Sequence, residues 1–522
     1  MARHLADRLG YGPRPGDLDR IASAGAERWI EQQLNPQSLP LPRDLTNRMA
    51  SFVTPRLSPP QIFVQYGPPA TRQPGSAKTP EQQQEIARHA LFVAQESIQL
   101  RLLRALESPR QLEECLADFW FNHFNVFLGK GLDRLWVGAY AEEAIRPHIL
   151  GRFRDLLGAT AKHPAMLFFL DNWLNTAPGS PGARGQFEGL NENYARELME
   201  LHTLGVAGGY TQEDVIALAR ILTGWTIVPW RDLAAARMDA PGMRWLRQQR
   251  QMQAAPAAGR DGFVFDSERH DFSDKRFLGR LVKGAGVEEG EAALDTLARS
   301  PATAQHVSYK LAQYFLADEP DKTVTAAMAR TFLASDGNIR AVLQTLFSSE
   351  PFRAPAAFGA KFKSPYRYVV SAVRAAGVPV RNFRPLEATM TRLGEHPYGC
   401  LTPDGYKNTQ EAWLNPDAMM LRLSFAVALA TGHLPLEAAP DDMGANGAAR
   451  PRLAAAAGRV QGAMPLPEEP EQLQARGPVL DEAALTATLG HQFSAATMAA
   501  IAAAPPELRA AMVLGSPEFM RC

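Results

Sequence analysis

The chain has 522 residues, 46% of them hydrophobic, and its 55 Lys and Arg residues balance its 55 Asp and Glu residues. This length allows two or three domains, or one large helical domain with insertions. Zero net charge and the lack of a basic stripe argue against a nucleic-acid-binding protein. No apolar run approaches the roughly 20 residues that a membrane-spanning helix needs. The three cysteines follow no disulfide or zinc-ligand spacing.

The N-terminal segment alternates charged and apolar residues and has no apolar core of the kind found in signal peptides. We therefore expect no signal peptide in this chain, which would make it cytoplasmic as it stands. Residues 3–34 predict two short helices, and the proline-rich stretch 54–82 predicts irregular structure.

A long helical run is predicted from about residue 80 to residue 127, with a break near Ser108 and Pro109. It ends in the aromatic-rich phrase FWFNHFNVFLGKG, which contains Asn122, His123 and Asn125. A single histidine among aromatic residues is more often a hydrogen-bonded core residue than a ligand. The amides on both sides keep a binding role open for all three side chains.

Residues 136–172 predict two further helices, the second of which ends at Asp171 and Asn172 after a strongly apolar turn. A carboxylate in such surroundings is costly to bury unless it is paired. The two residues therefore either cap the helix or contribute to a binding site. A loop rich in Gly, Pro and Ser follows at 176–189.

Residues 190–225 predict a hairpin of two helices and carry more ionisable and amide groups per turn than any other stretch. The first helix should end at Gly205, because glycine adopts positive φ without strain. The second should begin at Thr211, with Asp214 completing a capping box. Asn191 and Asn193 are poor helix formers at the start of the first helix, which suggests a binding role.

Residues three and four apart share one face of a helix, so Glu197 and Glu200 present two carboxylates to the same space. Arg196 and His202 lie at the edges of that space. Two carboxylates with an adjacent arginine suit general acid–base catalysis, and Glu197, Glu200 and His202 would suit a divalent metal such as Mg, Mn, Ca or iron better than structural zinc. The alternative is an ordinary solvated helix face.

Beyond the hairpin, residues 226–262 have no core periodicity and predict a surface insertion. Residues 263–265 predict a short strand. The adjacent His270 and Asp271, with Lys275 four residues after the aspartate, suit proton transfer or metal binding, although an ordinary loop explains them equally well.

The loop 394–416 mixes aromatic and polar residues, which suits a lid or the wall of a groove. The fold predicted for the whole chain is all-α, with long Pro- and Gly-rich loops and at most a small β element near 263–265. We expect a helical core domain over 1–433, a flexible Ala-, Pro- and Gly-rich connection over 434–480, and a C-terminal helical cap over 481–522.

Several phrases resemble those of a large bacterial family, the domain-of-unknown-function family numbered 1800. They include HLADRLGYGPRPGD, FWFNHFNV, HPAMLFFLDN, NENYARELMELHTLGVAGGYTQEDVIALARILTGW, SPATAQHVSYKL and PDGYKNTQEAWLNP, and together they extend over nearly the whole chain. The resemblance implies a mostly helical fold and no established activity. It also implies export, because many members look exported, and a partner from a sulfatase-like family numbered 1501, which is often encoded nearby. This chain differs in lacking a leader and in having Ser300 where the family commonly has histidine before proline.

Two functions follow as hypotheses. The first is a metal-assisted hydrolase, in which the hairpin carboxylates, the Asn122–His123 and Asp171–Asn172 pairs, and the His270–Asp271 pair converge on one cleft. The second is a non-catalytic binding or assembly partner of the sulfatase-like neighbour, in which the same polar residues form a structural network.

Overall fold

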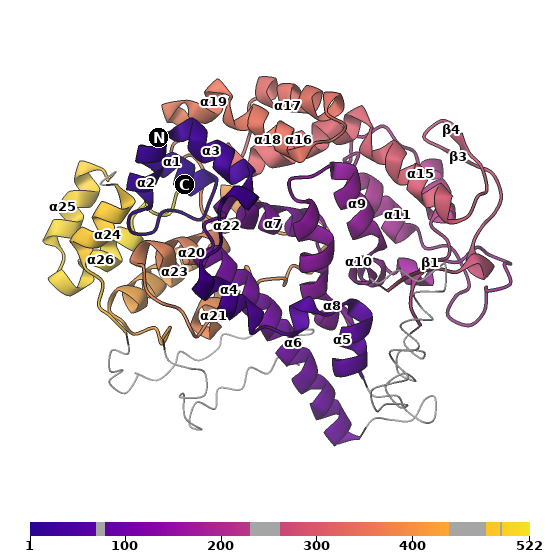
Figure 1. Cartoon of the computed structure of the whole chain (residues 1–522), viewed down its shortest axis with the longest axis horizontal. Coiled ribbons are helices and arrows are strands. Elements are labelled where there is room, and N and C mark those ends of the chain that lie inside the picture. Colours follow the sequence, from indigo (N-terminus) through magenta and orange to yellow (C-terminus); the bar gives the residue numbers. More distant parts are fainter. Residues whose placement is uncertain (69–78, 230–261, 438–476, 491–492) are drawn as a thin grey trace.

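The computed structural model of the chain describes residues 1–68, 79–229, 262–437, 477–490 and 493–522. Within these residues it contains 24 α-helices and two small sheets, so the predicted mainly helical fold is confirmed (Figure 1). The predicted strand is β2 (Phe263–Phe265), which pairs antiparallel with β1 (Trp225–Ile227). A second antiparallel pair, β3 (Lys275–Phe277) and β4 (Arg280–Val282), was not predicted.

The two ends of the chain lie close together in Figure 1. The N-terminal helices are α1 (Ala2–Arg8), α2 (Asp17–Ala24), α3 (Ala26–Leu34), α4 (Arg43–Ala50) and α5 (Pro59–Tyr66). The C-terminal helices are α24 (Glu482–Leu489), α25 (Ala495–Ala503) and α26 (Pro506–Leu514). Helix α24 packs against α2, and Arg3 donates a hydrogen bond of 2.7 Å to the backbone oxygen of Leu489.

Two consecutive helices, α6 (Pro80–Glu107) and α7 (Gln111–His123), form the middle of the molecule. Thr79 caps α6 in a capping box, and the helix stops before Ser108 and Pro109, which confirms the predicted break. The chain continues through α8 (Asp133–Ala139), a π-helical turn (Tyr140–Ile145), α9 (Phe153–Lys162) and α10 (Pro164–Phe169).

The polar stretch 190–225 forms α11 (Glu192–Glu200) and α12 (Gln212–Ile221), which pack against each other. The Thr211–Asp214 capping box is present, as predicted. The first helix is shorter than predicted, because the backbone N–H of His202 reaches the oxygen of Glu197 and widens the last turn. Gly205 then ends the segment at φ +80°.

The remaining helices wrap around this middle. They are α15 (Val287–Ala298), α16 (Pro301–Phe315), α17 (Lys322–Ala334), α18 (Ile339–Phe347), α19 (Glu350–Arg353), α20 (Pro365–Ala376), α21 (Arg384–Arg392), α22 (Gln410–Trp413) and α23 (Pro416–Ala430). Short 3-10 turns occupy Pro36–Ser38, Thr54–Arg56, Arg146–His148, Asn172–Leu174, Ser267–Arg269 and Pro355–Ala357. Helix α20 is almost entirely buried, and it carries one wall of the pocket described below.

A hydrophobic core cluster joins residues from Leu5 to Met520, so the N-terminal, middle and C-terminal helices share packing. Most of the predicted insertion (226–262) and of the predicted connection (434–480) lies outside the described residues. None of the described helices combines the length and the apolar character required to span a bilayer.

Candidate functional site

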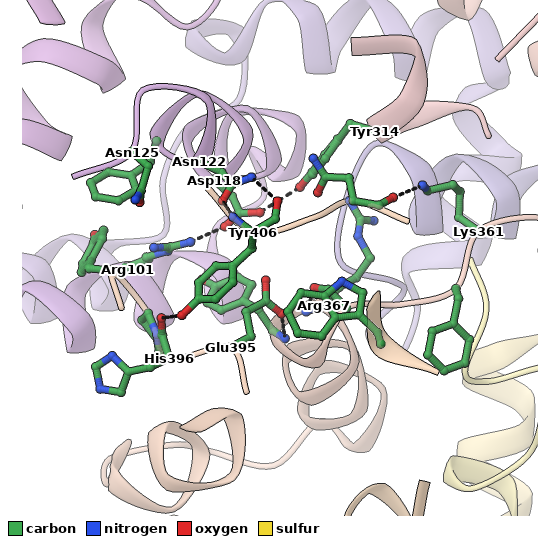
Figure 2. A pocket seen from close by; sticks show the side chains of 18 of the residues that line it. Arg101, Asp118, Asn122, Asn125, Tyr314, Lys361, Arg367, Glu395, His396 and Tyr406 are labelled. Carbon is green, nitrogen blue, oxygen red and sulfur yellow. Dashed lines mark hydrogen bonds and ion pairs between the residues drawn. The ribbon is translucent and has the colours of Figure 1, made fainter. Parts of the chain in front are cut away.

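A polar pocket lies between the middle helices α6 and α7, the buried helix α20 and the loop 394–416. It encloses about 50 Å³, room for roughly three or four water molecules. Its polar lining, labelled in Figure 2, comprises Arg101, Asp118, Asn122, Asn125, Tyr314, Lys361, Arg367, Glu395, His396 and Tyr406. Residues separated by some 300 positions in the sequence therefore meet in one cavity.

The floor of this pocket is an ion pair between Arg101 of α6 and Asp118 of α7. The guanidinium lies between the rings of Tyr366 and Tyr398, each with its centroid 4.7 Å away. The second carboxylate oxygen of Asp118 accepts a hydrogen bond of 3.0 Å from the Tyr314 hydroxyl. Aromatic faces and hydrogen bonds thus hold both charges in fixed positions.

Glu395 faces the same cavity and accepts a hydrogen bond of 2.7 Å from the backbone N–H of Tyr366. Burial and the nearby Asp118 carboxylate raise the pKa of Glu395 to about 7, although its hydrogen bonds and Arg101 act in the opposite direction. A carboxyl group with a pKa close to neutrality is suited to give and take protons at physiological pH.

The loop 394–416 forms a wall of the pocket, as its composition predicted, with His396, Tyr406 and Trp413 among the lining residues. Two of the predicted binding residues, Asn122 and Asn125, instead attach this loop to the end of α7. Asn122 exchanges two hydrogen bonds with the backbone of Tyr406, at 2.8 and 2.7 Å. Asn125 donates to the backbone oxygens of Cys400 and Thr402, at 3.0 and 2.8 Å. Both amides therefore position the wall that carries Glu395.

Asp171 and Asn172, predicted either to cap a helix or to contribute to a binding site, belong to an amide network with the hairpin. Asn172 is buried and donates to the backbone oxygens of Leu222 and Trp225, at 3.3 and 3.0 Å. Asn191 caps α11 and donates to the backbone oxygen of Asp171 at 2.9 Å.

Asn193 and Asp171 also make structural contacts in this region. Asn193 donates to the backbone oxygen of Leu170 at 3.4 Å, and the Asp171 carboxylate pairs with Lys130 at 2.8 Å. This network connects the end of α10 to both helices of the hairpin, which is a structural role.

His123 contacts the other end of the hairpin. Its Nε2 lies 3.1 Å from the backbone oxygen of His202, and the two rings are 6.2 Å apart. Burial lowers the pKa of His202 to about 3 and that of His123 well below its usual value, so both rings are neutral at pH 7. His123 is therefore the hydrogen-bonded core histidine that the sequence favoured over a ligand.

The carboxylates expected at the catalytic centre lie on the outer face of the hairpin. Arg196 contacts Glu192 and Gln212, at 3.3 and 2.9 Å, and Glu200 accepts a hydrogen bond of 3.1 Å from the Tyr210 hydroxyl. Partial burial and the neighbouring Glu200 carboxylate raise the pKa of Glu197.

The expected metal ligands do not come together. Glu197 and Glu200 are half-buried near the surface, whereas the His202 ring is buried against Phe124, 5.1 Å away. Among the described residues, no three His, Cys, Asp or Glu side chains are arranged to hold a metal ion. Because the helix ends after Glu200, His202 falls in a turn that directs its ring into the core.

His270, Asp271 and Lys275 belong to a third network, at the end of α12. The His270 ring lies between the backbone oxygen of Thr223, 2.8 Å from Nδ1, and a carboxylate oxygen of Glu289, 2.9 Å from Nε2. Lys275 donates to the other carboxylate oxygen of Glu289 at 2.6 Å. The side chains of His270, Lys275 and Glu289 are fully buried. These ions have no exposed face on which to meet a substrate.

Asp271 is on the outer side of the same network and pairs with Arg220 at 2.7 Å. Although partial burial acts to raise it, hydrogen bonds from Arg220 and Ser273 lower the pKa of Asp271 to about 2. A carboxylate held so firmly in its ionised form is a poor general base.

The residues expected to converge therefore all contact the hairpin or its neighbours, but in separate places rather than in one cleft. Sequence reasoning missed Arg101, Asp118, Arg367 and Glu395, which line the pocket. One signal was present, because Arg101 and Asp118 are charged residues within largely apolar helices, where a charge needs a partner.

No curated protein and no solved structure matches this chain. One family matches residues 4–521, which is nearly the full length, and it is described as "Protein of unknown function (DUF1800)". The family resemblance expected from the sequence is therefore confirmed, and the chain belongs to the DUF1800 family of proteins of unknown function.

Proposed function

We propose that the protein is a hydrolase and that Glu395 is its proton donor and acceptor. The observation that supports this proposal is a carboxyl group with a pKa of about 7 facing a polar cavity. Structural ion pairs usually lower the pKa of a carboxyl group, whereas catalytic acids have it raised toward the working pH.

In the proposed reaction, protonated Glu395 gives its proton to the leaving oxygen or nitrogen as the bond to that atom breaks. The carboxylate that remains takes a proton from a water molecule, whose oxygen bonds to the carbon or phosphorus atom that has lost the leaving group. One water is consumed and Glu395 is protonated again. Asp118 acts as a positioning residue, because its negative charge keeps the proton on Glu395.

This proposal differs from the expected metal-assisted hydrolase in the place of the site and in the chemistry. The described residues supply no ligand set on the hairpin, whereas the loop 394–416 supplies an acid–base group and a cavity. The proposed reaction therefore depends on proton transfer by Glu395.

The test is a screen of the purified protein against chromogenic esters, amides, glycosides and phosphate esters. Glu395→Gln should lower kcat/KM at least about a hundredfold on any substrate that is cleaved. Glu411→Gln, at an exposed position of α22, is the matched control and should leave the rate unchanged. Because the acid form is required, kcat should fall as the pH rises through about 7.

A rate that survives Glu395→Gln would contradict the proposal. If no class of substrate is cleaved and the protein co-purifies with its sulfatase-like neighbour, the binding or assembly role becomes the better account.

A further inference from the structure

Arg367 places a positive charge in the pocket wall without a carboxylate partner among the described residues. Its Nη1 donates to the backbone oxygens of Asp7 and Gly10, at 2.7 and 2.9 Å. Its Nη2 lies 3.9 Å from the Cys115 sulfur, a weak acceptor, and the guanidinium also contacts the ring of Tyr314, whose centroid is 5.2 Å from Cζ. Carbonyl oxygens satisfy part of the hydrogen-bonding capacity of a guanidinium but do not cancel its charge.

The other two cations of the pocket are neutralised. Arg101 pairs with Asp118, and Lys361 pairs with Asp318. Of the charged lining residues, this leaves Arg367 and Glu395 without an ion-pair partner. When Glu395 holds its proton, Arg367 is therefore left without an oppositely charged side chain among the described lining residues.

The phenols that line the pocket do not change this balance near pH 7. Burial raises the pKa of each lining phenol, so that the hydroxyls of Tyr314, Tyr366, Tyr398 and Tyr406 are uncharged. His396 lies at the rim, with its ring 3.2 Å from the carboxylate of Glu387. Loss of the Glu395 proton near pH 7 therefore adds one negative charge to the pocket.

We propose that this pocket takes a small anionic ligand of the carboxylate class, whose negative group pairs with Arg367. The inference rests on the proposed function, because it names the chemical class of that hydrolase's substrate. A planar guanidinium without a counter-charge is suited to a carboxylate, and partial shielding of the cavity from solvent strengthens the pair. Ionised Glu395 repels such a ligand, so the protonated enzyme is the form that binds it.

The inference predicts that ligand affinity depends on pH in the wild-type protein and does not depend on pH in Glu395→Gln. If only the enzyme with protonated Glu395 binds, raising the pH from 6 to 8 lowers affinity about tenfold, because the bound fraction follows the protonated fraction. In Glu395→Gln the group is always neutral. The affinity should then be the same at both pH values, even though this variant cannot catalyse the reaction.

The experiment is calorimetric titration and thermal melting of the full chain at constant ionic strength. The probes are acetate and succinate, with succinamide as the neutral control and 1,4-diaminobutane as the cationic control. We expect one or more of the carboxylates to bind and to raise Tm at pH 6, and neither control to do so. Arg367→Gln should abolish the effect, whereas Arg392→Gln, at an exposed position of α21, should not.

Three results would overturn the inference: no carboxylate binds, succinamide binds as well as succinate, or the pH dependence persists in Glu395→Gln. Arg367 is buried, and if its variant does not fold, the comparison of wild type with Glu395→Gln still decides. Carboxylate binding without any hydrolysis would support this inference and contradict the proposed function. Hydrolysis of neutral substrates without carboxylate binding would support the proposed function and contradict this inference.

Discussion

Asn122 holds the backbone of Tyr406 through two hydrogen bonds, one donated by its Nδ2 at 2.8 Å and one accepted by its Oδ1 at 2.7 Å. The side-chain amide thus replaces a strand partner and fixes the loop 394–416 to the end of α7. The Tyr406 hydroxyl in turn donates to the backbone oxygen of His396 at 3.1 Å, next to Glu395. One amide on α7 therefore positions the acid–base group.

Asn122→Ala should loosen this loop. Losing both hydrogen bonds leaves a partly buried backbone N–H and C=O of Tyr406 without partners, which we expect to lower the free energy of unfolding by about 2 kcal/mol. Hydrogen–deuterium exchange should become faster at residues 398–406 and stay unchanged in α16. Asn47→Ala, at an exposed position of α4, is the control and should have no such effect. Unchanged exchange in the loop would show that other contacts hold it.

Glu289→Gln should destabilise the protein strongly. The Glu289 carboxylate accepts hydrogen bonds from His270, Lys275 and the backbone N–H groups of Ala285 and Gly286. A neutral amide leaves the buried Lys275 ammonium without a counter-charge, at a cost of about 3 to 5 kcal/mol.

Urea denaturation at pH 7 measures this cost. Glu288→Gln changes the exposed neighbour on the same helix and should shift the midpoint very little. Equal midpoints for the two variants would mean that the buried ions contribute no net stability.

The local features of the fold could be predicted from the sequence, and the site could not. The Thr211–Asp214 capping box and the break at Pro109 depend on residues within four positions of each other, so their signals are explicit in the sequence. The grouping of Arg101, Asp118 and Glu395 depends on how α6 and α7 meet a loop almost 300 residues later. A single sequence carries no signal for contacts between residues so far apart in the chain.

The hairpin 190–225 shows why density of polar residues was a misleading guide to the site. Asn172 and His270 are buried, and Asn191 is half-buried, because they hold the hairpin to its neighbours through backbone oxygens and ions. A structural network and a catalytic centre use the same residue types. A catalytic centre adjoins a cavity that admits a substrate, and a structural network does not. By contrast, the loop 394–416, which its composition predicted to be a lid or the wall of a groove, carries Glu395 and does adjoin a cavity.

Glu395→Gln should stabilise the protein at neutral and alkaline pH. The folded pKa of Glu395 is raised above its unfolded value of 4.5 to about 7, so the folded state binds more protons than the unfolded state between these values. The free energy of unfolding of the wild type therefore falls as the pH rises from about 4.5 to 7. The neutral amide removes this penalty, and we expect a gain of about 3 kcal/mol at pH 8.

The measurement is the free energy of unfolding of both proteins at pH 4.5 and pH 8. The difference between them should be small at pH 4.5, where Glu395 is protonated in the folded state. A difference of the same size at both pH values would mean that packing, and not the proton, distinguishes the two side chains.

Gly290→Ala should destabilise the contact between α15 and β1. A Cβ at this position would lie 2.0 Å from Cζ2 of Trp225, a rigid ring that is fully buried. Helix propensity alone favours alanine by up to about 1 kcal/mol, but relieving this clash requires the helix or the ring to move. We expect a net loss of about 1 to 3 kcal/mol, with a change in Trp fluorescence. Gly189→Ala, where a Cβ would meet open space, is the control, and an equally stable Gly290→Ala protein would show that α15 is free to shift away from the ring.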